Sequence, residues 1–351
     1  MNKKSDGKNI RIFYFLTIML TFIVLIIGFV AFRFYASSLH SNQAEHVYDR
    51  YYVMITDDPR SSFWQSVYKG ALDRGIENNV YVELLGSTLS EDYSTLELMD
   101  IAISSHPDGI MVYADESEEM LERINLASAS GIPVVTLYND STLSNRCSFV
   151  GIGGYNIGRE YGKLIKRIVL DERRNGSERN EADIAVLTDS TQSEDALFSV
   201  IVSGLQETLA TGKDTNFSYN ISFVNVDNTN AFSAEESIRD IFAQDDIPDI
   251  LVCLNEQNTT CLYQAVVDYN KVGKVSILGY YDSPTILNAI LHNVVYATAS
   301  VDTYNMGQFC TDALEEYNML GNTSQYFTTE LTIIDSNNIA FHLKKEEESN
   351  E

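Results

Sequence analysis

The chain has few of the residues on which common catalytic and metal-binding sites depend. Four cysteines and five histidines are spread over 351 residues. The cysteines form no CxxC pattern and no compact disulfide framework, and the histidines show no metal-ligand spacing. Cys253 and Cys261 are near enough in sequence to approach each other, but we expect buried free thiols. We therefore expect no metal site.

Positive charge is also scarce. Lysine and arginine number 24 against 50 aspartates and glutamates, which gives a net charge of −26. Such a chain repels the phosphates of nucleic acids, and it is unsuited to a flat electrostatic contact with anionic lipid. Nucleic acid is therefore excluded as a partner.

Signatures of the common catalytic and nucleotide-binding sites are missing as well. The sequence contains no GxSxG, HExxH or P-loop element. The glycines of GIGGYNIG (151–158) lack the spacing of a dinucleotide fingerprint. Asp57 and Asp58 are neighbours in sequence, which does not by itself place two carboxylates across a glycosidic bond. We expect a protein that is not an enzyme and has no cofactor.

One long apolar run stands at the N-terminal end. Residues 12–32 carry no charge and lie between Arg11 and Arg33. As a helix they span roughly 30 Å, the thickness of a bilayer core. The basic tail (1–11) predicts a cytoplasmic N-terminus, with the chain after the anchor outside the cell membrane. Residues 33–50 are predicted to form a stalk.

Two other interpretations of the apolar run are a cleaved signal peptide and a buried core helix. A cleaved signal peptide has a shorter apolar core followed by small residues, whereas aromatic residues follow this one. A buried core helix needs one face that meets water. No cysteine directly follows the run to carry a lipid, so a tether would have to be the helix itself.

From Tyr51 onward, apolar runs of strand length alternate with segments of helical periodicity. We expect strands at 51–56, 80–85, 109–113, 132–137, 182–188, 219–226, 249–254, 275–280, 294–300 and 327–334. We expect helices at 63–78, 96–103, 120–129, 157–170, 196–210, 233–242, 260–270, 284–291 and 306–320. Short loops and continuously apolar strands indicate parallel sheets covered by helices on both faces. The prediction is an α/β fold of two doubly wound lobes, followed by a charged tail (342–351).

A binding cleft is expected between the two lobes, because ligands bind beyond the carboxyl ends of parallel strands. The loops that follow strands are therefore the places to look. They are residues 57–64, 114–116, 139–141, 189–195, 227–230, 255–258 and 281–283.

Seven motifs follow one another between Tyr51 and Ile334. They are SSFW with the following KGA, HPDGIMVY, SGIPVVTL, FVGIGGYNIGREYG, PDILVCLNEQ, VSILGYYDSPTIL and ATASVDTYNMG. With them the chain resembles the periplasmic-binding-protein type I family, in its sugar-binding branch (ribose/galactose-binding-protein-like). The resemblance rests on their order and spacing rather than on any single motif.

This resemblance implies two lobes joined by a three-strand hinge and closing on a ligand. The first lobe would comprise residues 51–152 and 301–322. The second would comprise residues 153–300 and 323–341.

The resemblance also implies the site. Aromatic faces would stack on a sugar ring and polar groups would fix its hydroxyls. The candidate ligand-binding residues are Phe63 and Trp64 for stacking, with Asp57, Arg60, Asn139, Asp140, Asn255, Tyr281 and Asp282 as polar groups. The family's second-lobe acid aligns with either Tyr281 or Asp282. Asp57 is also placed to cap a helix or a turn, and Asn139 and Asp140 are common turn residues.

The chain departs from the family pattern in the second lobe. FSVIVSG (198–204) lacks the arginine that the family commonly has there, and Val301 replaces its hinge glutamine. The usual aromatic near residues 227–230 is absent or shifted to Phe232. We therefore expect a far wall that is less cationic and less polar than in a hexose binder. The ligand would be a pentose, a modified sugar or another small molecule.

The favoured function is a membrane-anchored, extracytoplasmic solute-binding protein that closes on a carbohydrate and reports to a membrane partner such as a sensor kinase. The alternative is the substrate-binding subunit of a sugar ABC importer, whose partner would be a permease. A repressor of this fold would need an N-terminal helix-turn-helix where the apolar run stands. Consumption of the ligand would instead indicate an enzyme.

Overall fold

The computed structural model describes residues 19–33, 47–87, 89, 93–189, 196–211, 217–244 and 246–343. The chain divides into two compact units, Met1–Tyr48 and Asp49–Glu351. In the first unit, residues 19–33 form a helix. The rest of the predicted anchor (12–18), the tail 1–11, most of the stalk and the tail from residue 344 lie outside the described residues. No described helix is long and apolar enough to cross a membrane.

The second unit contains two six-stranded sheets. The first has the order β11-β5-β4-β3-β1-β2 and is parallel throughout. Its strands are β1 (Arg50–Ile55), β2 (Val80–Leu84), β3 (Gly109–Val112), β4 (Val134–Tyr138), β5 (Ser148–Ile152) and β11 (Tyr326–Thr329).

The second sheet has the order β12-β10-β9-β8-β6-β7, in which only the edge strand β12 is antiparallel. Its strands are β6 (Glu181–Asp189), β7 (Ser218–Val226), β8 (Ile250–Val252), β9 (Ser276–Tyr280), β10 (Val295–Val301) and β12 (Leu331–Asp335).

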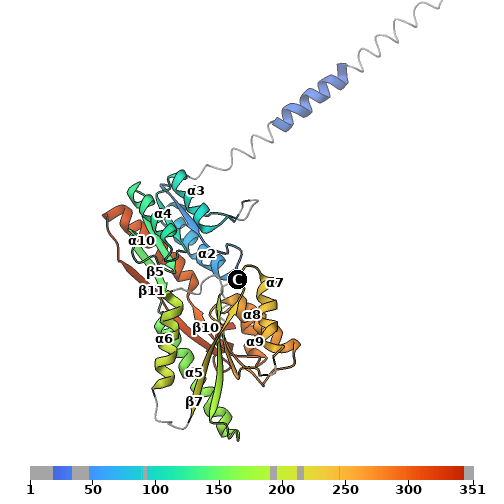
Figure 1. Ribbon diagram of the computed structural model, residues 1–351. Helices are drawn as coiled ribbons and strands as arrows, with labels where there is room; N and C mark the ends of the chain where they lie inside the picture. The colour runs from blue at the N-terminus through green and yellow to red at the C-terminus, as the bar shows by residue number, and fades with distance from the viewer. Residues whose placement is uncertain are drawn as a thin grey trace, which may run out of the picture. The chain divides into compact units, whose positions relative to one another are not determined.

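Helices cover both faces of each sheet. The first lobe carries α2 (Ser62–Glu77), α3 (Thr95–Ser105), α4 (Glu118–Ala129) and α10 (Thr303–Leu320). The second carries α5 (Gly154–Arg174), α6 (Ala196–Ala210), α7 (Ala231–Phe242), α8 (Glu256–Asp268) and α9 (Pro284–Leu291). Figure 1 shows α10, near the red end of the colour bar, among the N-terminal helices of the first lobe.

Alternation along the strands explains this layering. In β1, Tyr52 and Met54 enter the core shared with α2 and α10, whereas Val53 and Ile55 enter the core shared with α3 and α4. Successive strand residues point to opposite faces, so a strand covered on both sides must be apolar throughout. The predicted two-lobed α/β architecture is confirmed.

The chain passes between the two sheets three times, each time through one residue. Gly153 separates β5 from α5, Asp302 separates β10 from α10, and Glu330 separates β11 from β12. The backbone N–H of Asp302 donates to the carbonyl oxygen of Glu330 at 3.2 Å. Two of the three crossings are thereby tied together.

The last predicted strand, 327–334, is in fact two strands. Its first half, β11, pairs with β5 in the first sheet, and its second half, β12, pairs with β10 in the second. The assignment of residues 323–341 to the second lobe was therefore wrong for β11. A continuous apolar pattern does not show that a strand leaves one sheet and enters another.

Candidate functional site: a cleft between the lobes

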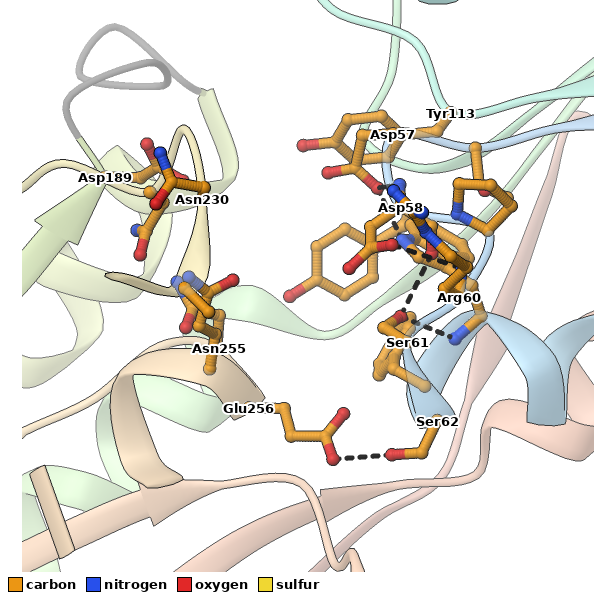
Figure 2. A pocket seen from close by; sticks show the side chains of 18 of the residues that line it. Asp57, Asp58, Arg60, Ser61, Ser62, Tyr113, Asp189, Asn230, Asn255 and Glu256 are labelled. Atoms are coloured by element: carbon orange, nitrogen blue, oxygen red, sulfur yellow. Dashed lines mark hydrogen bonds between the residues drawn. The ribbon is translucent and has the colours of Figure 1, made fainter. Parts of the chain in front are cut away.

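A cleft of about 1090 Å³ lies between the lobes, beyond the carboxyl ends of both sets of strands. The first lobe contributes the segment from Thr56 to Trp64, residues that follow β2 and β3, and the last residue of β4. The second contributes residues that follow or end β6, β7, β8 and β9. This is the position where open α/β sheets bind ligands. Figure 2 shows the two walls facing each other.

A tight turn sets the first wall. The backbone N–H of Ser61 donates to the carbonyl oxygen of Asp58 at 3.2 Å, with Pro59 at the second position of the turn. Ser61 is the N-cap of α2, and its hydroxyl accepts from the backbone N–H of Trp64 at 3.3 Å. Turn and cap together fix the first turn of α2, which carries Phe63 and Trp64.

Five of the aromatic side chains that line the cleft pack against one another, and we call them the aromatic floor: Phe63, Trp64, Tyr113, Tyr138 and Tyr280. Trp64 meets Phe63, Tyr113 and Tyr138 edge to face, with centroid separations of 4.9, 5.4 and 5.9 Å. Edge-to-face packing stabilises these rings against one another and holds them at steep angles.

The backbone at Tyr138 is unusual. Its φ is +65°, and the N–H of Asn139 donates to the carbonyl oxygen of Leu137 at 2.8 Å. This three-residue turn is of the rare, strained γ type. Beside it, the Nδ2 group of Asn139 donates to the hydroxyl of Tyr113 at 3.1 Å. The turn and the amide together position two rings of the aromatic floor.

Asp57 lies against this floor. The indole N–H of Trp64 and the backbone N–H of Asp58 both donate to its carboxylate. Solvent reaches the side chain, yet the walls of the cleft strip much of its hydration. Desolvation, with a smaller contribution from the charge of Asp58, raises the pKa of Asp57 to about 6.

The second wall is polar. Asn255 caps α8, with its Oδ1 accepting from the backbone N–H of Asn258 at 2.7 Å. The hydroxyl of Ser62 donates to Glu256, which links the two walls (Figure 2). The side chain of Asn228 has neither amide atom hydrogen-bonded to a described residue. Nor do Gln257 Nε2 and, on the first wall, Thr56 Oγ1 have such a partner.

Five of the nine predicted site residues line the cleft. They are Asp57, Arg60, Phe63, Trp64 and Asn255. Trp64 and Phe63 are 5% and 7% exposed, so both belong to the core as well as to the cleft wall.

The other four predicted residues do not line the cleft. Asp140 forms an ion pair with Arg146 and accepts from the hydroxyl of Thr136 at 2.7 Å. Asn139 is 4% exposed and positions Tyr113. This loop follows a strand, as predicted, but the Asp140 carboxylate and the Asn139 amide N–H bond to residues of the first lobe.

The side chains of Tyr281 and Asp282 likewise bond to other residues of the protein. The hydroxyl of Tyr281 donates to the carbonyl oxygen of Ser62 at 3.3 Å, and its ring packs on Phe63 at 5.3 Å. Asp282 accepts from the hydroxyl of Ser300 at 2.7 Å, and burial raises its pKa. Tyr281 thus contacts the first lobe from the second, beside the cleft rather than within it.

Sequence reasoning missed several lining residues. They are Thr56, Tyr113, Tyr138, Asn228, Glu256, Gln257 and Tyr280. Asn228, Glu256 and Gln257 fall within the candidate loops, and the other four directly precede such loops. Extending each candidate loop by one residue into its strand would have included them.

The described residues offer no metal site and no disulfide. None of their His, Cys, Asp and Glu side chains forms a group of three or more suited to a metal ion. All four cysteines are free thiols, and burial raises the pKa of each of them. Raised thiol pKa values make these groups weak nucleophiles.

Comparison with known proteins identifies the fold's relatives. A family model described as a periplasmic binding protein domain matches residues 51–321. Three similar structures cover most of this chain. GanP, a glucose-galactose binding protein from Geobacillus stearothermophilus, has a TM-score of 0.69 at 20% identity, over 82% of this chain and 97% of its own.

The XylFII–LytSN complex has a TM-score of 0.69 at 23% identity, over 82% of this chain and 98% of its own. A sugar ABC transporter (sugar-binding protein) from Bacillus halodurans has a TM-score of 0.66 at 22% identity, over 83% of this chain and 99% of its own. No curated protein matches the chain. The family model spans both lobes, and the fold has the two sheets with a cleft at their strand ends. This chain therefore belongs to the periplasmic binding protein family.

Proposed function

We propose that the protein binds a carbohydrate in the cleft and closes its two lobes on it. One observation carries this proposal: the aromatic floor lies in the same cleft as polar atoms that lack partners within the described protein. Aromatic faces stack on the C–H faces of a sugar ring, and amide and hydroxyl groups fix its hydroxyls. Thr56 and Asn228 would supply such groups from opposite walls.

Closure would turn about the three single-residue crossings. A ligand that contacts both walls binds the closed state better than the open state, and so shifts the population toward closure. The Ser62–Glu256 hydrogen bond already joins the walls at one edge of the cleft. No step in this mechanism changes the ligand chemically.

We also propose that the protein is anchored in the cell membrane by residues 12–32, with the binding lobes outside the cell. The support is the charge-free run in the sequence and the helix at 19–33. A sensor kinase in the same membrane is the proposed partner. XylFII, which shares this fold, forms a complex with a second protein, LytSN.

The second candidate is a subunit that delivers sugar to an ABC importer. The Bacillus halodurans relative, a sugar ABC transporter protein, supports it. Cross-linking of the full-length protein in membranes, followed by identification of the captured membrane protein, separates the two roles. A kinase supports the sensor and a permease supports the importer.

The binding proposal is tested by a thermal-shift screen of residues 37–351 against pentoses, hexoses, inositols and small non-sugars. A ligand that binds only the native state raises the melting temperature by mass action. A shift with one sugar class, and recovery of that sugar unchanged, is the expected result. A shift only with non-sugars contradicts the carbohydrate proposal, and conversion of the sugar contradicts the non-enzymatic mechanism.

Trp64 provides the mutational test. Trp64→Ala removes a ring of the floor and should weaken binding by about tenfold or more. Because Trp64 is nearly buried, it should also lower the free energy of unfolding by about 3–5 kcal/mol. Tyr269→Ala, which removes a ring stacked on Phe242 away from the cleft, is the control and should leave affinity unchanged. Equal ligand affinities of the two variants would show that Trp64 does not contribute to binding.

A further inference from the structure

The charges of the cleft are strongly unbalanced. Its described lining contains five carboxylates (Asp57, Asp58, Asp189, Glu235 and Glu256) and a single cation, Arg60. Glu235 is paired with Arg239 at 2.7 Å. Asp57 and Asp58 lie on the first wall and Glu256 lies on the second, as Figure 2 shows.

Three of these carboxylates receive only neutral hydrogen-bond donors. Asp57 accepts from the Trp64 indole, Asp58 from the backbone N–H of Arg60, and Glu256 from the Ser62 hydroxyl. Within the described ranges, none of the three forms an ion pair with Lys, Arg or His. Their negative charges are therefore not neutralised by the protein around them.

The aromatic floor adds a second attraction for positive charge. The indole of Trp64 meets Tyr113 and Tyr138 edge to face, so the rings are steeply inclined to each other. The π face of an aromatic ring attracts a cation, most strongly on tryptophan, and more so in a partly desolvated site. Asp57 is hydrogen-bonded to the same indole. A cation bound to this carboxylate would lie beside the aromatic floor.

A third observation points to a ligand at this place rather than to an acidic surface alone. Thr56, directly before Asp57, is 2% exposed and lines the cleft. Its hydroxyl has no hydrogen-bond partner among the described residues. Buried polar groups without partners cost free energy, which a bound ligand would recover.

From these observations we propose that the ligand carries a protonated amine, as an amino sugar or an aminated polyol does. The amine would lie beside Asp57 and the Trp64 ring, with hydroxyls reaching Thr56 and Asn228. This inference rests on the proposed carbohydrate-binding function and specifies its chemical class. Uronates and sugar phosphates are repelled by the same carboxylates.

The test uses matched sugars and the full-length protein. Titration calorimetry at about pH 7 compares glucosamine, glucose and glucuronate, and the corresponding galactose series. At this pH most of the amine is protonated and Asp57 is mostly ionised. We expect the amine to bind about tenfold tighter than the neutral sugar, the usual worth of a charged hydrogen bond, and the acid not to bind. Added salt should weaken the binding of the amino sugar and leave the binding of the neutral sugar unchanged.

Asp57→Asn sharpens the test, because it removes the charge and keeps an oxygen to accept from the indole. It should abolish the preference for the amine, whereas Glu122→Gln, an exposed carboxylate on α4 outside the cleft, should not. Neutral sugars that bind as tightly as the amines would overturn the inference and leave the proposed function standing. Absence of binding by all six sugars, with a shift from a neutral pentose or inositol in the thermal-shift screen, would overturn the inference alone; absence of any carbohydrate shift would overturn both.

Discussion

Tyr138 places its ring in the cleft through a backbone conformation that costs free energy. A non-glycine residue at φ +65° within a γ-turn is strained, typically by about 1–3 kcal/mol. The surrounding packing, with Phe63 at 5.2 Å and Trp64 at 5.9 Å, holds it there. Strain of this kind persists where a side chain must point in one direction.

The strain at Tyr138 can be measured with two truncations. Alanine and glycine both remove the ring, but only glycine adopts a positive φ without steric cost. Tyr138→Gly should therefore be more stable than Tyr138→Ala, by about 1 kcal/mol. The reverse order, which holds at ordinary positions, would show that the γ-turn is not strained. Urea unfolding of both variants gives the comparison.

Asp57 makes the stability of the protein depend on pH. Its pKa of about 6 in the fold lies above the ordinary value of about 3.9, so the folded state binds the proton more tightly than the unfolded state does. Stability from this group is present at low pH and falls as the pH rises from about 4 to 6.

Asp57→Asn should therefore stabilise the ligand-free protein above about pH 6 and have little effect near pH 4. We expect about 1 kcal/mol, because solvent in the cleft screens the carboxylate. Urea unfolding at about pH 4 and pH 7.5 gives the two values. If Asp57→Asn changed the free energy of unfolding equally at both pH values, the raised pKa would be contradicted. A variant less stable than the wild type at about pH 7.5 alone would contradict it as well.

At the scale of elements, α2 and α10 approach so closely that glycine is required at the contact. A Cβ atom on Gly307 would lie 1.8 Å from the carbonyl oxygen of Val67, and one on Gly70 would lie 1.9 Å from that of Tyr304. Backbone atoms cannot rotate away from such a clash. The contact brings α10, which follows 225 residues after α2 ends, onto the first lobe.

Gly307→Ala should push α10 away from α2 and lower the free energy of unfolding by about 3 kcal/mol, the upper end of the usual cost of overpacking. Gln308→Ala, at the next position of the same helix, is the control and should change stability by less than about 0.5 kcal/mol. Thermal unfolding of the two variants distinguishes a close contact from a general effect of alanine. Similar stabilities would show that the helices can separate freely.

Secondary structure was predictable from periodicity because strands and helices here are long and strongly patterned. The predicted helices 196–210 and 284–291 coincide with α6 and α9. The division of the last strand was not predictable, since β11 and β12 are both partly apolar and only one residue separates them. Which sheet a strand joins depends on tertiary pairing.

The candidate site was predictable to the level of loops, because parallel strands end on the cleft. Individual residues were not. Asp140 lies in a loop that follows a strand, yet its carboxylate forms an ion pair with Arg146, six residues further along the chain. Tyr138 was not predictable, because it is the last residue of a buried strand and has a positive φ where it lines the cleft. Neither a local ion pair nor a single dihedral angle can be read from hydrophobic patterning.

At the scale of the whole molecule, the single-residue crossings should set the free energy of closure. Two glycines inserted after Glu330 would lengthen one crossing and add open conformations that closure must exclude. We expect ligand affinity to fall about fivefold or more, a loss of about 1 kcal/mol. The same insertion after Gly176, in the turn that ends α5, should have no effect. Equal affinities would place the closing motion elsewhere.

Crossings of one residue, with Asp302 hydrogen-bonded to Glu330, place the pivot of the proposed closure close behind the cleft. In a lever of this kind, the mouth of the cleft and the surface behind the pivot move in opposite senses. Narrowing the mouth around a small molecule would spread the outer surfaces behind the crossings. A protein seated there could therefore read occupancy as a change in spacing, without ever touching the ligand.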